Sequence, residues 1–549
     1  MHLKIIVVLL QLVFVVFADD DGTIVTISNG KIQGKTKKSL DEQKYYAFEG
    51  IPYAAPPTGD NRFKAPQKVD DWDGVLATKR NEKACLQIIA VIPQGSEDCL
   101  YLNVYTPADL KSSNSQSLPV LVWFYGGSYQ TGSTADVKPV YFMDYEVILV
   151  TVNYRLGVFG FLSTGDDVAS GNWGLKDQRF ALQWVKKNID QFGGDPNKVT
   201  IGGQNAGASS VGYHMLTDTH RNIRKGLFRA VISESGSPLC PQYFQSSPKK
   251  YADELATLID SSFKGNSEAL VALLRKQTPE KLTRLSNAIK LRHLPINDPV
   301  QSIFIYNVWL PVIEDSDSDS ALIYHPMHKD FMDGKFSDIP LLIGYNSEEA
   351  IYYPDYVAAL AFSSRINDNP QSLVFDNLNV EDKTQAGNDI KAIYASSFKD
   401  NKGLLLEFFS DNVYTTPIIR QAELVSKKSP VYLYEFAYRG SNQLIRFEEA
   451  DNVGHAFELR YLFGNKKFNS KNDKLLHERM MKMWTNFVKY MNPTPDEDDD
   501  LVKWSKVKSS NNMEYLIINS TLEMSSQPKR YKKWKAVLSE HLSSPYWVY

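Results

Sequence analysis

The sequence lacks an excess of charge of either sign. Its 61 basic and 64 acidic residues leave a formal net charge of −3 over 549 residues. A nearly balanced charge gives no electrostatic footprint for a polyanion. We therefore expect no nucleic-acid partner and no attraction to an anionic membrane surface.

Long apolar runs are missing beyond the N-terminus. After residues 5–17, no run approaches the ~18 apolar residues that a membrane-spanning helix needs. We therefore expect no membrane span. Residues 540–549 also carry neither a retention signal nor a lipid-anchor tail.

The one apolar stretch that is present predicts a secretory signal at residues 1–18. Lys4 forms a short basic region, and residues 5–17 are almost wholly apolar. Val16 and Ala18 are the small residues expected before cleavage ahead of Asp19. We predict that the protein is secreted to the extracellular space, with residues 19–549 as the mature chain.

Cysteine is scarce, with three residues in the chain. Cys85 and Cys99 enclose a short loop that an oxidising compartment would close, with about 3 kcal/mol of entropic stabilisation. Cys240 is left over, either as a buried free thiol or in an intermolecular bridge. Asn519 begins an Asn-Ser-Thr sequon and is a predicted glycosylation site.

Metal-ligand spacing is absent as well. The acidic runs 314–319 and 496–500 do not have the spacing of a Ca²⁺ loop, and we interpret them as solvated loops. We expect no metal ion and no cofactor.

Apolar runs alternate with helical patterns along the chain. Residues 120–124, 147–152 and 431–436 are candidate buried strands, and residues 175–189 carry an apolar stripe at helical spacing. This alternation predicts an α/β fold, with a large, mostly parallel sheet covered by helices on both faces. Without a linker or repeat, we expect one large domain with long insertions.

The strand predicted at residues 198–201 leads into Gly203-Gln204-Asn205-Ala206-Gly207 and then into a helix. A strand, a tight turn flanked by glycines and a helix are typical of a nucleophile elbow, Gly-x-Ser-x-Gly. The scaffold of the elbow is intact, but an asparagine stands where the nucleophilic serine would be.

Motifs spread over nearly the whole mature chain carry a family resemblance. They are found at residues 48–63, 97–103, 153–157 and 171–178. Together they resemble the type-B carboxylesterase and cholinesterase family, most closely its arthropod esterases. The resemblance implies an α/β-hydrolase fold, and it matches Cys85 and Cys99 to the first disulfide of that family.

The resemblance also assigns the catalytic positions. It places Glu349 as the acid and His455 as the base of a triad whose nucleophile position is Asn205. It implies an oxyanion hole formed by the backbone N–H groups of Gly126, Gly127 and Ala206. The usual His-Gly-Gly-Gly motif is Tyr125-Gly126-Gly127-Ser128 here, so we expect an altered hole.

Asn205 removes the standard ester-hydrolysis mechanism. A carboxamide nitrogen has a delocalised lone pair, and loss of a triad serine costs on the order of 10⁶ in kcat, or about 8 kcal/mol. Ser209 and Ser210 lie further along the predicted helix, and we do not expect them to substitute. Asparagine does tolerate the positive φ of an elbow, and its amide could donate a hydrogen bond to His455.

Three functions remain open. The first is a catalytically inactive homologue that binds a hydrophobic ester-like or hormone-like small molecule, and the second is a secreted protein that binds an extracellular protein partner. The third is a carboxylic ester hydrolase with atypical or residual activity. Acetylcholine is not expected as a ligand, because residues 86–98 contain no aromatic side chain for a cation–π contact. Residues 88–92 would suit an apolar ligand or form a buried structural loop.

Overall fold

The computed structural model describes residues 23–544, apart from 81–82, 113–116, 218–225, 294–306, 315–320, 353–367, 376, 395–397, 399–401, 442–449, 452, 496–497, 499, 509–511 and 529. The signal predicted at residues 1–18 lies outside the described residues.

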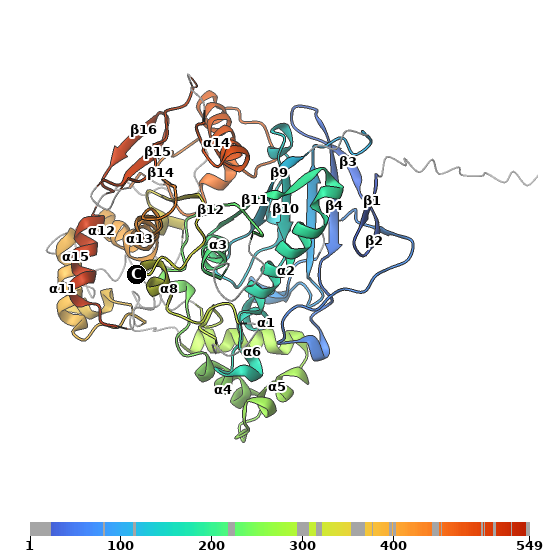
Figure 1. Ribbon diagram of the computed structural model, residues 1–549. Helices are drawn as coiled ribbons and strands as arrows, with labels where there is room; N and C mark the ends of the chain where they lie inside the picture. The colour runs from blue at the N-terminus through green and yellow to red at the C-terminus, as the bar shows by residue number, and fades with distance from the viewer. Residues whose placement is uncertain are drawn as a thin grey trace, which may run out of the picture.

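A mixed sheet of eleven strands forms the centre of the described part of the chain (Figure 1). From edge to edge, its strands are β16 (Leu522–Ser526), β15 (Glu514–Ile518), β14 (Val431–Phe436), β13 (Leu341–Asn346), β12 (Ala230–Glu234), β11 (Gly194–Gln204), β9 (Leu118–Phe124), β10 (Ile148–Val152), β8 (Tyr101–Thr106), β4 (Lys44–Pro52) and β3 (Lys35–Lys38). The strands from β15 across to β10 pair in parallel, and the strands outside them pair antiparallel.

The central strands have apolar sequences because both faces of the sheet are buried there. Every residue of β10 is buried, and its Val150 lies opposite Val122 of β9 and Val104 of β8. Continuous β-branched and apolar runs of this kind fit a sheet that is covered on both sides. The predicted α/β fold is thereby confirmed.

Helices lie on both sides of the sheet (Figure 1). Helix α3 (Ala206–Thr217) contacts β11 and β12, α13 (Thr416–Val425) contacts β13, and α14 (Lys471–Tyr490) contacts β9 and β11. The predicted helical stripe at 175–189 belongs to α2 (Trp173–Asn188), except for Ile189, which begins a short 3-10 helix, Ile189–Phe192. The other α-helices in the described ranges are α1 (Gly157–Phe161), α4 (Pro248–Ile259), α5 (Ser267–Arg275), α6 (Pro279–Arg292), α8 (Met327–Met332), α11 (Lys383–Tyr394), α12 (Lys402–Ser410) and α15 (Tyr531–His541).

Two small sheets complete the described strands. One contains β1 (Ile24–Ile27), β2 (Gly30–Gln33) and β5 (Val75–Ala77), and the other is the hairpin of β6 (Gln87–Ile89) and β7 (Ile92–Gln94). No helix in the described ranges is long and apolar enough to cross a bilayer.

One acidic run differs from its interpretation as a solvated loop. Glu314 is buried, and its carboxylate pairs with Lys176 at 2.5 Å and accepts from the Asn172 side chain at 2.8 Å. A charge can be buried here because a cation and amide donors surround it. Residues 315–320 lie outside the described residues.

The carboxyl ends of the parallel strands position the predicted site. The loop with Gly126 and Gly127 follows β9, Asn205 follows β11 and Glu349 comes shortly after β13. Loops at this edge of an open α/β sheet are the usual place for a ligand.

Candidate active site

The elbow places Asn205 between strand β11 and helix α3. Asn205 has φ of +59°, and it is almost fully buried. A Cβ on Gly207 would lie 2.0 Å from the Phe124 carbonyl oxygen, and one on Gly203 would lie 2.4 Å from the Gly207 carbonyl carbon. Only glycine fits at either position. The expectation that asparagine adopts positive φ here is confirmed.

The predicted acid and base lie together in a buried pair. His455 Nδ1 is 2.5 Å from Glu349 Oε2, and both side chains are almost completely excluded from solvent. The other Glu349 oxygen accepts the backbone N–H of Asn346 at 2.7 Å. The carboxylate therefore fixes the orientation of the ring, as a triad acid would.

Two amide nitrogens meet the other nitrogen of the imidazole. Asn205 Nδ2 is 2.7 Å from His455 Nε2, and Gln204 Nε2 is 2.8 Å from the same atom. An amide nitrogen can only donate, so His455 Nε2 accepts and the ring proton sits on Nδ1, facing Glu349. The predicted hydrogen bond from Asn205 to His455 is confirmed.

The carbonyl oxygen of Asn205 faces the loop of the predicted oxyanion hole. The backbone N–H groups of Gly127 and Ser128 donate to Asn205 Oδ1 at 3.2 and 2.9 Å. Because both partners are N–H donors, the oxygen must face them and the NH₂ group must face His455. The asparagine side chain therefore takes up two backbone donors of the predicted oxyanion loop.

The three predicted oxyanion residues have different places. Gly127 donates to Asn205 Oδ1, and Ala206 is the first residue of α3. Gly126 lies against the elbow: a Cβ added to Gly126 would lie 2.8 Å from the Asn205 Cβ. The Ser128 N–H was not in the predicted set, although Ser128 is the next residue along the same loop.

Tyr125 points away from the hole. Its ring stacks on Tyr154 with centroids 4.6 Å apart, and the Tyr154 hydroxyl donates to the Tyr125 carbonyl oxygen at 2.7 Å. The Tyr125 side chain, which is larger than the usual histidine of this motif, therefore packs against Tyr154. It leaves the N–H groups of Gly127 and Ser128 directed at Asn205.

Tyr414 closes another side of the imidazole. Its ring centroid lies 4.7 Å from that of His455, and its hydroxyl accepts from Asn205 Nδ2 at 3.4 Å. Tyr414 belongs to a π-helical turn, Asp411–Thr415, between α12 and α13. The ring and hydroxyl restrict movement of both His455 and Asn205.

Two further buried carboxyl groups stand behind the acid–base pair. Burial, and then the negative charge of Glu349, raises the pKa of Glu458 to about 7. Burial and the neighbouring Glu458 likewise raise the pKa of Glu234 well above its ordinary value. The Asn346 side-chain amide donates to Glu458 at 2.5 Å, and Trp484 Nε1 donates to Glu234 at 2.6 Å.

A cavity of about 700 Å³ opens over Asn205. This volume is in the range of small-molecule sites. Apolar side chains line part of it, namely Leu86, Ile88, Leu156, Val158, Phe159 and Trp309. Helix α6 contributes a polar strip of Thr283, Ser286, Asn287 and Lys290. The cavity therefore offers both apolar and hydrogen-bonding surface.

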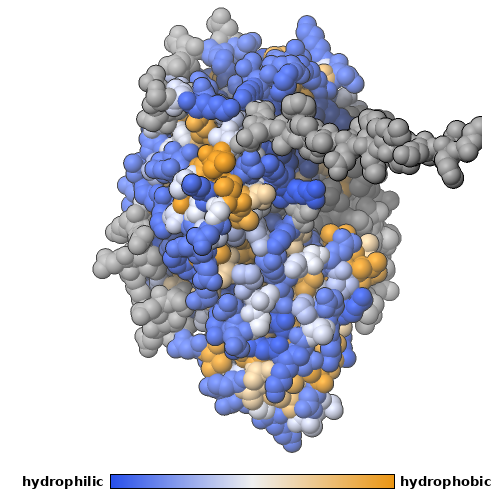
Figure 2. All heavy atoms as spheres, turned by 90° about the vertical axis from the view of Figure 1, so that its right-hand side faces the viewer, coloured by the Kyte–Doolittle hydropathy of each residue, from blue (hydrophilic) through white to orange (hydrophobic). Residues whose placement is uncertain are grey.

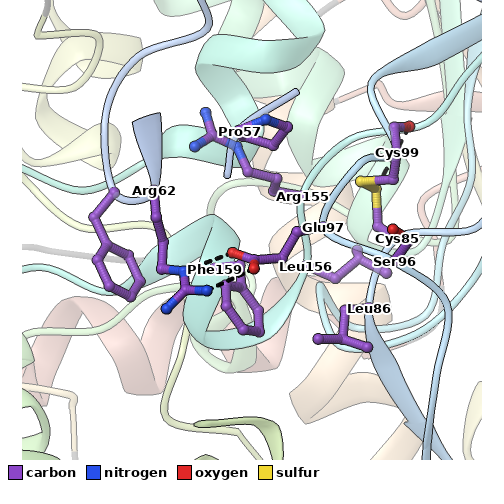
Figure 3. Close-up of a pocket in the computed structure, with 11 residues that line it drawn as sticks. Pro57, Arg62, Cys85, Leu86, Ser96, Glu97, Cys99, Arg155, Leu156 and Phe159 are labelled. Carbon is purple, nitrogen blue, oxygen red and sulfur yellow. Dashed lines mark hydrogen bonds and ion pairs between the residues drawn. A yellow bond between two sulfur atoms is a disulfide. The ribbon is translucent and has the colours of Figure 1, made fainter. Parts of the chain in front are cut away.

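The disulfide loop forms part of the cavity wall. Cys85 and Cys99 are joined, as predicted, and Cys240 is a buried free thiol. At the base of the loop, the Arg62 guanidinium meets the Glu97 carboxylate in a buried two-pronged ion pair at 2.6 Å (Figure 3). This pair anchors the loop next to the disulfide.

The tip of the same loop is exposed. It is the β6–β7 hairpin, whose turn residues Ala90 and Val91 have φ of +49° and +67°. Val91 is 79% exposed. Of the two interpretations of residues 88–92, the buried structural loop is therefore wrong at the tip, while Ile88 and Ala90 line the cavity.

Residues outside the centre are placed as follows. Ser209 and Ser210 lie inside α3, as expected, and the Ser210 hydroxyl donates to the Ala206 carbonyl oxygen at 2.8 Å. Asn519 lies in the partly exposed turn between β15 and β16. Its glycosylation stays a prediction.

Gln204 and the Ser128 N–H were missed by sequence reasoning. Each adjoins a predicted site residue, and this position in the chain is the only signal that could have indicated them. The contacts themselves depend on how β9, β11 and the histidine loop meet, which adjacent residues do not reveal.

The sheet, the elbow and the His–Glu pair together define a protein of the α/β-hydrolase class with an esterase-type site. A model of the Carboxylesterase family matches residues 21–534. The chain is 32% identical to a Carboxylic ester hydrolase of Bombus ignitus, over 97% of each chain. It is also 33% identical to Juvenile hormone esterase of Tribolium castaneum, covering 85% of this chain and 84% of the relative. The chain therefore belongs to the Carboxylesterase family.

A solved structure agrees with this assignment. Juvenile Hormone Esterase from Manduca sexta, with OTFP covalently attached, superposes with a TM-score of 0.81 at 25% identity. The match covers 94% of this chain and all of the other.

Proposed function

We propose that this Carboxylesterase-family chain is a secreted homologue that is catalytically inactive toward esters and binds a hydrophobic, ester-like small molecule in the cavity above Asn205. One observation carries the proposal: the Asn205 carboxamide fills the oxyanion hole and also occupies the acceptor nitrogen of His455.

Two physical obstacles to ester hydrolysis support inactivity. No nucleophile stands at the elbow, which costs on the order of 10⁶ in rate. In addition, a substrate carbonyl cannot reach the Gly127 and Ser128 donors while Asn205 Oδ1 holds them. An ester bound above the elbow would keep its carbonyl unpolarised.

The cavity supports the choice of ligand. Its apolar side, with Leu86 and Phe159, would bury a hydrophobic body, and the strip on α6 could bind a polar group. Similarity to juvenile hormone esterases favours an apolar ester, and we extend that chemistry to this chain as binding only.

Covalent labelling tests the proposal most directly. The purified wild-type protein should form no adduct with a fluorophosphonate or with OTFP, as read by intact-mass spectrometry. Asn205→Ser serves as the positive control for labelling. A stoichiometric adduct on the wild-type chain would contradict inactivity.

Binding is tested separately. Apolar esters should quench tryptophan fluorescence, since Trp309 lines the cavity, and should be recovered intact after incubation. A matched substitution, Leu86→Asp, should weaken binding because it places a charge in the apolar wall. Recovery of the hydrolysed acid would instead support the alternative below.

The alternative is a carboxylic ester hydrolase with atypical or residual activity, and the retained His455–Glu349 pair favours it. An extracellular protein partner is a third possibility. On the face shown in Figure 2, the described hydrophobic residues form several small groups separated by hydrophilic ones, so the described residues offer a partner no broad apolar area there.

A further inference from the structure

We infer that the site hydrolyses the side chain of its own Asn205, converting the carboxamide to a carboxylate with release of ammonia. This inference goes beyond ligand binding and does not depend on it. It concerns one covalent modification of the chain, at the residue that fills the oxyanion hole.

The geometry presents Asn205 as an amide substrate. Its carbonyl oxygen accepts from the N–H groups of Gly127 and Ser128 at 3.2 and 2.9 Å. These donors are placed to stabilise negative charge on Oδ1 when Cγ becomes tetrahedral. They belong to the backbone, so they are held in position by the loop after β9.

The leaving group faces the acid–base pair. Asn205 Nδ2 lies 2.7 Å from His455 Nε2, and His455 Nδ1 lies 2.5 Å from Glu349. The imidazole can therefore accept a proton from water and pass it to Nδ2, while the carboxylate of Glu349 stabilises the imidazolium between the two steps.

Water has a route to the reacting carbon. Asn205 and Gln204 both line the 700 Å³ cavity, so solvent reaches the elbow from that side. Gln204 Nε2 lies 2.8 Å from His455 Nε2, so a water that displaces this amide would contact the base and lie beside Asn205.

The reaction balances without any co-reactant except water. The water oxygen bonds to Cγ as its proton moves to His455 Nε2, and the Oδ1 anion is held by Gly127 and Ser128. The Cγ–Nδ2 bond breaks as His455 protonates Nδ2, which leaves a carboxylic acid and ammonia. The acid then gives its proton to the ammonia. Carboxamide plus water thus gives carboxylate plus ammonium, with no change in oxidation state.

The product changes the floor of the cavity. A negative charge would replace a neutral amide beside His455. The conversion is a single turnover, because the product carboxylate stays attached to the chain.

The experiment follows the elbow peptide of the folded wild-type protein. The protein is incubated at neutral pH in heavy-oxygen water, digested and examined by mass spectrometry. We expect position 205 to become aspartate carrying one heavy oxygen, with no isoaspartate. Asn346, which is also buried but donates to the Gly454 carbonyl and to Glu458, should remain an amide and serves as the internal reference.

Two variants separate catalysis from spontaneous deamidation. His455→Ala should slow the conversion on the order of 100-fold or more, because it removes the acid–base group. His541→Ala, on α15 and bonded to Asp389 away from the cavity, should leave the rate unchanged. Circular dichroism checks that both variants fold.

Three results would overturn the inference. They are an unchanged Asn205 in the folded wild type, isoaspartate as a main product, and an equal rate in His455→Ala. Isoaspartate would indicate attack by the backbone nitrogen of residue 206 in place of water. Because each readout is the mass of one peptide, ligand binding and esterase assays do not affect the outcome.

Discussion

The two halves of the site differ in what they can still do. The half with His455 and Glu349 keeps a buried, oriented acid–base pair, with 2.5 Å between Nδ1 and the carboxylate. In the other half, Asn205 closes the hole with its own carbonyl oxygen. On our proposal, proton transfer and carbonyl polarisation are therefore separable: Asn205 takes up the Gly127 and Ser128 donors, while the His455–Glu349 pair stays in place.

The largest expected effect comes from Asn205→Ser, which changes the half of the site that contains the Gly127 and Ser128 donors. The change supplies a hydroxyl beside His455 and frees the Gly127 and Ser128 donors at the same time. We expect esterase activity on short aryl esters, recovering several of the ~8 kcal/mol of transition-state stabilisation that a missing serine costs. Hydrolysis rates of the purified variant measure this.

Asn205→Ser/His455→Ala is the matched control and should be inactive. If Asn205→Ser folds and binds esters but hydrolyses none, the site differs from an active esterase at more positions than residue 205. Recovery should be partial, because Gln204 still donates to the nitrogen that must accept the serine proton.

A smaller effect, on the free energy of unfolding, is expected when the hydrogen bonds to Asn205 Oδ1 are removed. Asn205→Ala leaves the Gly127 and Ser128 N–H groups without their acceptor and places alanine at φ of +59°. We expect a loss of about 1–3 kcal/mol in the free energy of unfolding, measured with urea. Asn197→Ala, an exposed asparagine on β11, should stay within about 0.5 kcal/mol of wild type.

The acid–base half should show a pH dependence of stability. Folding raises the pKa of Glu458 from 4.5 to about 7, so the folded state binds more protons between these values. Protonation of Glu458 therefore stabilises the folded state fully below pH 4.5, and this stabilisation is lost as the pH rises through about 7. We expect a loss on the order of 3 kcal/mol across this window, because each pKa unit corresponds to about 1.4 kcal/mol.

Urea unfolding at several pH values tests this, with Glu458→Gln as the comparison. The glutamine cannot ionise, so the slope should flatten. The negative charge of Glu349 raises the pKa of Glu458, whereas the Asn346 side chain and His455 lower it. Glu458 in turn raises the pKa of Glu234, and the Ser235 hydroxyl also contacts the Glu458 carboxylate. An unchanged slope would assign the pH dependence to other groups.

The smallest effect concerns Gln204, whose amide competes with a serine at position 205 for His455 Nε2. In the Asn205→Ser background, Gln204→Ala should raise kcat/KM by roughly 2–10-fold, the value of one hydrogen bond that no longer competes for Nε2. Gln191→Ala, an exposed amide, is the control and should change nothing measurable. A decrease in the Gln204 variant would show that this amide positions the ring.

Much of the fold followed from local pattern. The runs at 147–152 and 431–436 became β10 and β14, and the stripe at 175–189 became most of α2, because burial imposes a period that the residues display. Glu314 was misjudged, since its buried partner Lys176 is distant in the chain and nothing local distinguishes a paired carboxylate from a solvated one.

The sequence by itself determined the elbow, the missing nucleophile and the candidates Glu349 and His455, because glycine spacing and residue chemistry are local properties. The tertiary structure alone decided where the Asn205 amide points. Its oxygen meets N–H groups from the loop after β9, and its nitrogen meets a histidine 250 residues away. A carboxamide has a donor and an acceptor at equal reach, so only the surrounding partners can choose its orientation.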